Sequence, residues 1–318
     1  MERRLFIKKA GTVAALGSML STTNLMSQAI NTKMRKFKMC LNPGAVGINA
    51  TQETLLDIAI RHGFEAIIGL PSDLAAMSET AMDAYLAKMK ANQISFGIAG
   101  LPVQFRESEQ KFKEDLEKLP ALAKGCERAG LKGMGTWIMP THKDLTYLEN
   151  FKQHAARLGE VANIIGHYGL SLGLEYVGPK TLMARDKFSF VRTMKETKEL
   201  IGGIGEANVG IQLDSFHWYC AGETATDLLT LDKEDIITVD LNDARTGLTP
   251  DTQTDGKREL PAATGVIDIK AFLDALVQIG YEGPVRAEPF NQPLRDMEDE
   301  AAAKATYAAM KKAFDMIG

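Results

Sequence analysis

Short apolar runs alternate with segments of helical periodicity along almost the whole chain. Eight runs have the length and composition of buried β-strands, and a segment with apolar residues every three or four positions follows each of them. The predicted strands are residues 37–41, 66–70, 94–101, 133–139, 171–176, 210–213, 236–241 and 284–288. Strands that alternate with helices in this way predict a parallel sheet.

The intervening segments read as helices whose ends are marked by glycine. They span residues 51–62, 80–91, 109–129, 148–168, 188–201, 226–231, 269–279 and 296–317. Gly63, Gly130, Gly169, Gly202 and Gly280 each follow the last predicted turn of a helix. A left-handed residue at this position favours glycine, so these five residues predict the helix ends.

Eight strand–helix units predict an α/β fold in the form of a single (β/α)8 TIM barrel. Right-handed crossovers and a length of about 280 residues fit this architecture. An open doubly wound sheet is the competing fold, but no GxGxxG motif follows the first strand. We see no internal linker, so the predicted barrel domain covers residues 36–318.

The first 35 residues are predicted to be an export signal and a short linker. Arg3 and Arg4 precede Leu5, Phe6 and Ile7, and a modest apolar stretch over residues 10–20 leads into small polar residues. This order resembles a twin-arginine signal, and the apolar stretch is too short to span a bilayer. The prediction is therefore a periplasmic protein without a membrane span in its mature form. A basic amphipathic helix or a disordered start is the alternative.

The distribution of charge along the chain argues against a nucleic-acid partner. The whole chain has a net charge of −4, but residues after 38 contain 29 basic and 40 acidic residues. An acidic body lacks the basic surface that nucleic acids require, which excludes a nucleic-acid partner. Cys40, Cys126 and Cys220 show no CxxC spacing and read as buried free thiols.

Four acidic residues lie at the ends of predicted strands in the second half of the chain. They are Glu175, Asp214, Asp240 and Glu288. In a barrel all four meet at one rim, where each carboxylate raises the pKa of the next. A divalent cation among them is the simplest compensation, so the sequence predicts a metal site.

Polar and aromatic residues extend this predicted site. Gln212, Thr238 and Arg286 each lie two positions before one of the acids and therefore face the same side of a strand. His217 follows Asp214 by three residues, and His142 is a weaker candidate. Trp137 and Trp218 fall near the rim, where aromatic faces suit the C–H surfaces of a sugar.

Longer motifs around these residues resemble a known family. They read GLEYVGPKT, QLDSFHWYCAG, VDLNDA and KRELPAATGVIDIKAFLDALVQIGYEGPVRAEPF. The chain resembles the xylose isomerase-like TIM-barrel superfamily, the sugar phosphate isomerase/epimerase family. The resemblance implies that Glu175, Asp214, Asp240 and Glu288 hold a metal, and that His217 and Arg258 lie near the substrate. Asp240 stands where the family usually has His, and residues 260–265 depart from the usual Leu-Pro-Gly turn.

The resemblance implies a metal-dependent sugar isomerase or epimerase. Such an enzyme moves a proton next to a carbonyl through a metal-stabilised enediolate. Glu175 and Glu288 would exchange the proton, while His217, Arg258 and Lys180 orient hydroxyl groups. The oxygen-rich ligand set favours Mn²⁺ or Mg²⁺, with Co²⁺ and Zn²⁺ as alternatives.

The sequence leaves two other functions open and disfavours a third. A lyase or hydrolase that acts on 3-keto-glycosides would use the same atoms, and an exported enzyme meets glycosides readily. A non-catalytic sugar-binding barrel is the second. Phosphodiester cleavage is disfavoured because the predicted rim has few histidines and the body is acidic. The loop 245–265 reads as a lid over the rim, and the sequence leaves homo-oligomerisation open.

Overall fold

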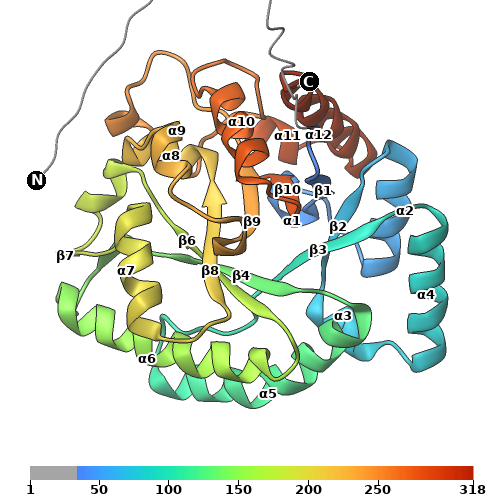
Figure 1. The fold of residues 1–318 in the computed structure, drawn as a ribbon, viewed down its shortest axis with the longest axis horizontal. Coiled ribbons are helices and arrows are strands. Elements are labelled where there is room, and N and C mark those ends of the chain that lie inside the picture. The colour runs from blue at the N-terminus through green and yellow to red at the C-terminus, as the bar shows by residue number, and fades with distance from the viewer. Residues whose placement is uncertain (1–33, 318) are drawn as a thin grey trace, which may run out of the picture. The chain divides into compact units, whose positions relative to one another are not determined.

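The computed structural model describes residues 34–317, which form a closed barrel of eight parallel strands (Figure 1). Around the ring the order is β1, β10, β9, β8, β6, β4, β3 and β2. Their bounds are β1 (Lys38–Leu41), β2 (Ala66–Gly69), β3 (Ser95–Gly100), β4 (Gly133–Ile138), β6 (Ser171–Tyr176), β8 (Val209–Asp214), β9 (Ile236–Leu241) and β10 (Pro284–Ala287). A separate antiparallel pair joins β5 (Thr141–His142) to β7 (Phe188–Ser189).

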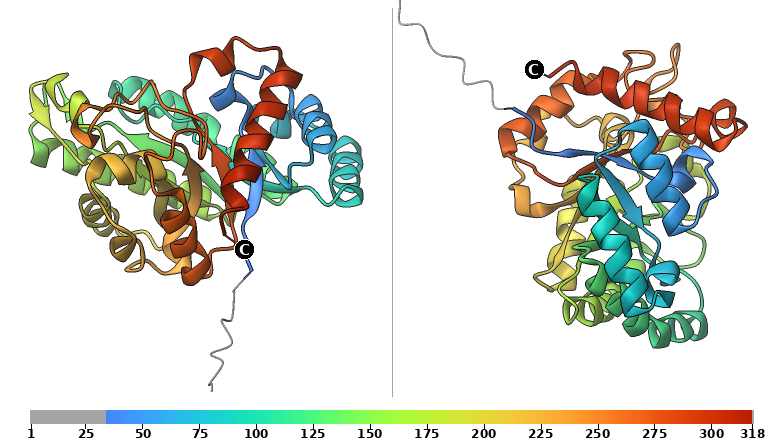
Figure 2. Two further views of the ribbon diagram at one scale, coloured as in Figure 1. Left: turned by 90° about the horizontal axis from the view of Figure 1, so that it is seen from above. Right: turned by 90° about the vertical axis from the view of Figure 1, so that its right-hand side faces the viewer.

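Helices surround the barrel on its outside, as two further views show (Figure 2). The longer ones are α2 (Gln52–His62), α4 (Glu79–Ala91), α5 (Glu109–Ala129), α6 (Tyr147–Gly166), α7 (Met194–Ile204), α10 (Ile269–Ile279) and α12 (Asp299–Phe314). Shorter helices are α1 (Pro43–Val46), α3 (Pro71–Ala76), α8 (Ser215–Ala221), α9 (Ala225–Leu228) and α11 (Gln292–Arg295). Single 3-10 turns are η1 (Lys180–Ala184), η2 (Lys233–Asp235) and η3 (Pro250–Thr252). Within the described residues, each helix is too short or too polar to cross a membrane.

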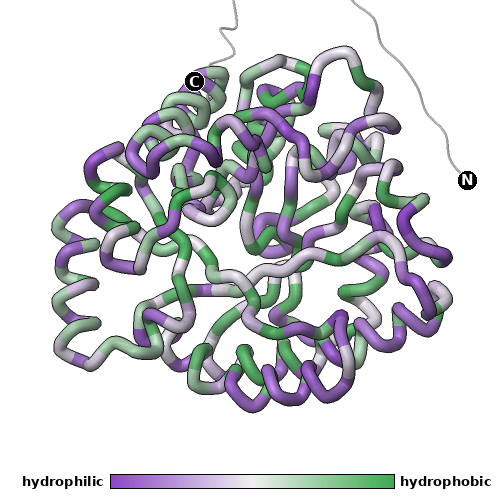
Figure 3. The backbone as a smooth tube through the Cα atoms, turned by 180° about the vertical axis from the view of Figure 1, so that it is seen from behind, coloured by the Kyte–Doolittle hydropathy of each residue, from purple (hydrophilic) through white to green (hydrophobic). Residues whose placement is uncertain are grey.

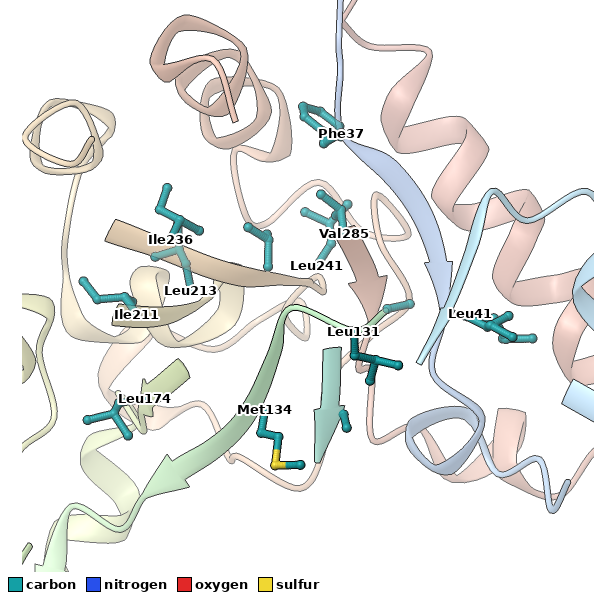
Figure 4. Packing of buried hydrophobic residues seen from close by; sticks show 14 of the residues in the cluster. Phe37, Leu41, Leu131, Met134, Leu174, Ile211, Leu213, Ile236, Leu241 and Val285 are labelled. Carbon is teal, nitrogen blue, oxygen red and sulfur yellow. The ribbon is translucent and has the colours of Figure 1, made fainter. Parts of the chain in front are cut away.

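The main apolar core lies between the strands and the helices. Leu174, Leu213 and Val285 are fully buried and alternate with the inward-facing residues of their strands. Figure 4 shows these side chains among the buried apolar residues of the strands, and Figure 3 shows hydrophilic residues along the surrounding helices. Burying one such side chain contributes roughly 1.5–3 kcal/mol, so this layer stabilises the barrel.

The inside of the barrel is unusually polar near its carboxyl end. The residues that alternate with the apolar layer on β6, β8, β9 and β10 include Glu175, Gln212, Thr238, Asp240 and Arg286, all buried. Because side chains alternate along a strand, an apolar outward layer leaves these polar positions to face one another inside the barrel. The fold thus concentrates charge at one end of the ring.

All eight predicted strands are confirmed, and every strand end lies within one residue of the prediction. Gly63, Gly130 and Gly280 are confirmed as left-handed residues that end α2, α5 and α10. Gly169 also has a positive φ, but it lies in the turn beyond His167, which ends α6.

The predicted helix 188–201 is wrong at both ends. Its first two residues form β7, and α7 begins only after Thr193, whose side chain forms a capping box with Glu196. The helix continues past Gly202 and ends at Gly205, which has a φ of 76°. Gly202 therefore lies inside the helix and does not end it.

The predicted export signal and linker cover residues 1–35, of which residues 1–33 lie outside the described part of the chain. Arg35 belongs to the barrel, because its guanidinium donates hydrogen bonds to both carboxylate oxygens of Glu65. Cys40, Cys126 and Cys220 are buried free thiols, as predicted.

Candidate active site

Four carboxylates meet at the carboxyl end of the barrel. Glu175 is the fifth residue of β6, Asp214 ends β8, Asp240 is the fifth residue of β9, and Glu288 directly follows β10. One oxygen from each lies within 4.8 Å of an oxygen from every other. The parallel register produces this convergence, since Asp214 pairs directly with Asp240 across β8 and β9.

Glu175 is the least compensated of the four acids. It is 4% exposed, and its Oε1 is buried without a hydrogen-bond partner. Burial and the neighbouring carboxylates of Glu288 and Asp240 raise its pKa well above the usual range. Burial of an unpaired ionised carboxylate costs free energy, so this oxygen favours either a bound proton or a bound cation.

Asp214 is held rigidly by four donors. Its Oδ1 accepts the backbone N–H groups of Phe216 (2.6 Å) and His217 (3.0 Å), which caps α8. Its Oδ2 accepts hydrogen bonds from Asn242 at 2.7 Å and from Arg258 at 3.0 Å. Burial raises the pKa of Asp214 to about 6 despite the opposing effect of Arg258.

Asp240 forms a buried ion pair instead of facing the site freely. The Nε and Nη2 groups of Arg286 donate to its two oxygens at 2.6 and 2.7 Å, and Gln212 donates at 3.0 Å. Arg286 is the direct neighbour of Asp240 across β9 and β10. Both oxygens of Asp240 therefore have protein donors already, and its predicted role as a metal ligand stays a prediction.

Arg258 links the loop after β9 to the strands. Its guanidinium donates to Asp214, to Glu288 Oε2 at 3.3 Å and to Asp255 Oδ1 at 2.7 Å. The side chain is 1% exposed and stacks between the rings of Phe216 and Phe290. Phe290 has a φ of 40°, a strained conformation for a residue other than glycine. Such strain persists where surrounding contacts fix the chain, here beside the site.

His217 lies in the first turn of α8 with a neutral ring. Its Nδ1 accepts the N–H of Gly178 at 3.2 Å, and its Nε2 lies 3.1 Å from Arg258 Nη2. Burial and then Arg258 lower the pKa of this histidine to about 3. Gly178 is required here, because a Cβ at this position would clash with the carbonyl oxygen of His217.

A cavity of about 300 Å³ opens above these residues. Its lining consists of Trp137, Met139, Glu175, Val177, Leu182, Arg185, His217, Asp255, Arg258, Glu288 and Phe290. Of the predicted substrate-binding residues, Trp137, His217 and Arg258 are in this lining. A volume of this size accommodates one sugar ring, with polar groups on one side and apolar groups on the other.

Two predicted substrate-binding residues lie outside this lining. Lys180 pairs with Asp251 at 2.7 Å, and both side chains are about half exposed. Trp218 is 5% exposed, packs against Phe272 and donates its Nε1–H to the carbonyl of Thr224. The structure therefore gives Trp218 a packing role, which is the commoner role of a tryptophan in an apolar run.

Sequence reasoning missed three residues that shape the site. Asn242 bridges Asp214 and the backbone N–H of Glu288, Asp255 pairs with Arg258, and Phe290 covers Arg258. Asn242 lies two positions after Asp240, so strand alternation could have found it. Asp255 and Phe290 lie on loops, where the sequence carries no periodic signal.

The predicted lid loop 245–265 is anchored at both of its ends. Asp243 and Glu259 exchange two backbone hydrogen bonds of 2.9 Å. The carboxylate of Asp243 also accepts the N–H groups of Thr264, Gly265 and Ile267. The loop thus delivers Asp255 and Arg258 to the cavity wall from a fixed frame.

The charges of the cluster fit one divalent cation. The four acids carry four negative charges, and the buried Arg258 and Arg286 supply two positive ones. Asp255, which pairs with Arg258, adds a fifth carboxylate, so the ionised groups carry a net charge of −3 that one divalent ion largely offsets. Glu175 has a buried oxygen without a partner, and it forms a potential donor set with Asp214 and His217 as well as with the other acids. The residues present therefore suit a metal.

Comparison with known proteins identifies the family of the chain. The sequence model of the xylose isomerase-like TIM barrel family matches residues 56–313. The chain belongs to this family. This result confirms the resemblance seen in the sequence and agrees with the closed barrel of eight parallel strands.

Named members of the family with similar sequences are inosose isomerases. The chain is 24% identical to the inosose isomerase of Bacillus velezensis over 292 residues, which cover 87% of this chain and 98% of that protein. It is also 24% identical to the Bacillus subtilis inosose isomerase, over 88% of this chain and the full length of the relative.

Solved structures of the family superpose over nearly the whole barrel. A xylose isomerase domain protein from Alicyclobacillus acidocaldarius is 31% identical, with a TM-score of 0.77 over 88% of this chain and 99% of that one. The IolI protein, crystallised with a bound zinc atom, is 23% identical, with a TM-score of 0.72 over 89% of this chain and 99% of that one.

Proposed function

We propose that this protein is a sugar isomerase or epimerase that transfers a proton at a carbon next to a carbonyl group. The observation that carries the proposal is the pair formed by the buried Glu175 and the partly buried Glu288, whose carboxylates meet in the cavity lining. Burial and neighbouring acids raise the pKa of both, that of Glu288 to about 8. Carboxyl groups tuned toward neutral pH can both accept and return a proton.

The remaining groups of the site would orient the substrate. His217 stays neutral, and Arg258 is fixed by three carboxylates, so both present hydrogen-bonding groups of defined position to a keto-sugar. Trp137, Met139 and Phe290 supply an apolar wall for the C–H face of the ring. The names of the relatives, inosose isomerase among them, support a cyclic or open-chain keto-sugar as substrate.

A divalent cation completes this proposal. Glu175 and Glu288 would hold it, with Asp214, Asp240 and His217 beside them; the oxygens of Asp214 and Asp240 already accept hydrogen bonds from protein donors that include Arg258 and Arg286. The mostly oxygen donors favour Mn²⁺ or Mg²⁺, and the neutral imidazole keeps Co²⁺ and Zn²⁺ as alternatives. When bound, such an ion stabilises negative charge that develops on the oxygens next to the reacting carbon.

Proton exchange in D2O tests the proposal whatever the final product is. The metal-repleted protein is incubated with a panel of ketoses and inososes, and deuterium at the carbon next to the carbonyl is followed by NMR. Removal of one proton-transfer group costs about 10²- to 10⁴-fold, so Glu175→Gln and Glu288→Gln should each lower the exchange rate by at least about 10²-fold.

The matched control is Glu282→Gln, which removes an exposed carboxylate paired with Lys36 far from the cavity lining. This variant should exchange deuterium at the wild-type rate. Near-wild-type exchange in a folded Glu175→Gln or Glu288→Gln variant would contradict the proposal. So would the absence of exchange from every keto-sugar in the panel.

Elimination from a 3-keto-glycoside is a second candidate, because the same proton abstraction would expel a group two carbons from the carbonyl. A second cavity beside the first gives this candidate a specific structural basis. Release of free aglycone from a 3-keto-glycoside, measured by chromatography, distinguishes elimination from isomerisation.

A further inference from the structure

A second cavity of about 210 Å³ adjoins the active-site cavity. Trp137, Met139 and Arg185 line both, so the two cavities form neighbouring compartments of one cleft. The second compartment lies between the ends of β4 and β5 and the start of α6. Its other lining residues include Arg106, His142, Asn150 and His154.

Several buried polar atoms without partners lie in or near these two compartments. Among the described residues there are six such side-chain atoms. Three belong to Glu175, Gln212 and Thr238 in or below the active site, and three belong to lining residues of the second cavity: Arg106 Nε, Asn150 Oδ1 and His154 Nε2. Since buried polar atoms almost always have a protein or water partner, three orphans around one cavity mark positions where water or the polar groups of a ligand would bind.

The hydrogen-bonding character of these atoms is mixed. His154 is 3% exposed, and its Nδ1 lies 3.0 Å from the carbonyl of Asn150, so Nδ1 carries the proton and Nε2 accepts. Burial lowers the pKa of His154 to about 3, which keeps the ring neutral. Asn150 Oδ1 is a second acceptor, whereas Arg106 Nε–H is a donor.

Hydroxyl groups satisfy this mixture, and an anion does not. A carboxylate or a fully ionised phosphate monoester only accepts hydrogen bonds, so it would leave His154 Nε2 without a donor. A hydroxyl both donates and accepts, and two or three of them on one ring would match the two acceptors and the donor.

The aromatic residues around Arg106 support the same ligand. The guanidinium of Arg106 lies between the rings of Phe105 and Trp137, with distances of 4.1 and 3.6 Å to their centroids. Its Nη2 donates to Thr136 Oγ1 at 2.8 Å and to the carbonyl of Trp137. Trp137 is therefore fixed in the shared wall, yet 42% exposed.

We propose that the second cavity binds a second hydroxyl-bearing ring, so that the substrate is a keto-sugar joined to another sugar or polyol ring. The inference rests on the proposed function, which places the reacting ring in the first cavity. Asn150 and His154 accept hydrogen bonds from the second ring, Arg106 donates to it, and Trp137 separates the two rings.

Binding to the inactive Glu175→Gln variant tests this without turnover. A 3-keto-disaccharide and the corresponding 3-keto-monosaccharide are titrated by calorimetry into this variant alone, and with His154→Phe or Asn150→Leu added. His154→Phe keeps the ring contacts with Phe105 and Phe190 and removes Nε2. Each loss of one hydrogen bond should raise Kd for the disaccharide about 3- to 10-fold, with no change for the monosaccharide.

The control is His167→Phe, at the other end of α6. Its Nδ1 also contacts a backbone carbonyl four residues earlier, but the side chain lies outside both cavities. This variant should bind both sugars as the parent does. Asn150→Leu keeps the test valid if His154→Phe fails to fold.

Two outcomes separate this inference from the proposed function. If both sugars bind equally well in all variants, or weaken equally, the second subsite is refuted while proton exchange on monosaccharides still supports the isomerase. If the disaccharide binds selectively through Asn150 and His154 but the wild-type protein exchanges no proton, the subsite stands and the proposed function fails.

Discussion

At the level of single residues, the site is organised by two buried arginines. Arg286 pairs with Asp240, and Arg258 pairs with Asp214, Asp255 and Glu288. Glu175 alone among the four acids receives no hydrogen bond at its buried Oε1. The four carboxylates thus have different environments, which gives them different roles despite their similar positions.

The Asp240–Arg286 pair makes the first prediction. Arg286→Met leaves Asp240 buried without its ion-pair partner and should lower the free energy of urea unfolding by about 3–5 kcal/mol.

Asp240→Asn should still bind Mn²⁺ in calorimetry, because Arg286 and Gln212 already donate hydrogen bonds to both oxygens of Asp240. Glu175→Gln is the comparison and should weaken Mn²⁺ binding, because it removes a proposed ligand. Loss of binding in a folded Asp240→Asn variant would show that Asp240 is a ligand after all.

The raised pKa of Glu288 predicts an unusual pH dependence for the metal-free protein. Burial and Asp240 raise this pKa from 4.5 to about 8, so between these values the folded state holds a proton that the unfolded state lacks. Stability must therefore fall as pH rises, by about 1.4 kcal/mol per pH unit for one such group. His154 and His217 act in the opposite sense, but only below their ordinary pKa of 6.5.

Urea unfolding of the chelator-treated protein at pH 7 and pH 8 measures this effect. Glu288→Gln should remove the part of the fall in unfolding free energy that Glu288 causes. Saturating Mn²⁺ should also reduce this fall, because a cation favours the ionised carboxylates. A metal-free protein that becomes more stable over this interval would refute the assignment.

At the level of elements, the strands and helices with a regular apolar pattern were predictable from the sequence. Elements without such a pattern were not. The eight strands followed from apolar runs, but α8 lies in the apolar sequence SFHWYCA, which has no polar face to give it a period. Only the tertiary structure shows that Asp214 ends a strand and caps this helix at the same time.

Two glycines inside helices give a matched prediction. In Gly125→Ala, on α5, the new Cβ would lie 2.7 Å from the backbone of Ala75 in α3. This clash should cost about 1–3 kcal/mol of unfolding free energy. A Cβ at Gly202, on α7, meets nothing within 4 Å, so Gly202→Ala should stabilise by about 0.5–1 kcal/mol. Urea denaturation checks both, and equal effects would contradict the close packing of α3 on α5.

At the level of the whole molecule, we propose that residues 1–35 direct export to the periplasm. A double Arg3→Lys, Arg4→Lys variant should accumulate in the cytoplasm of a host with the twin-arginine pathway, and fractionation with immunoblotting measures this. Unchanged export would refute the proposal. Replacement of Lys8 and Lys9 by Arg is the control, because it keeps the charge and leaves the arginine pair intact.

The structure also sets where the leader can be removed. A deletion of residues 1–33 should leave the melting temperature of the barrel unchanged, since Arg35 still reaches Glu65 and stacks on Phe314. A longer deletion that also removes Arg35 would break its bidentate, partly exposed ion pair with Glu65 and should therefore lower the melting temperature. A lower melting temperature in the shorter deletion alone would show that the leader contributes to the fold.

The sequence by itself determined the barrel and the rim on which four acids meet. Alternation fixes which residues of a strand share a face, and parallel topology brings strand ends together, so both follow from local patterns. Only the tertiary structure decided how those acids are partnered. The guanidinium groups of Arg258 and Arg286 reach across loops and strands distant in sequence, and the second cavity joins residues of β4, α6 and the loop before α5. Such contacts depend on packing in three dimensions, which no periodicity along the chain encodes.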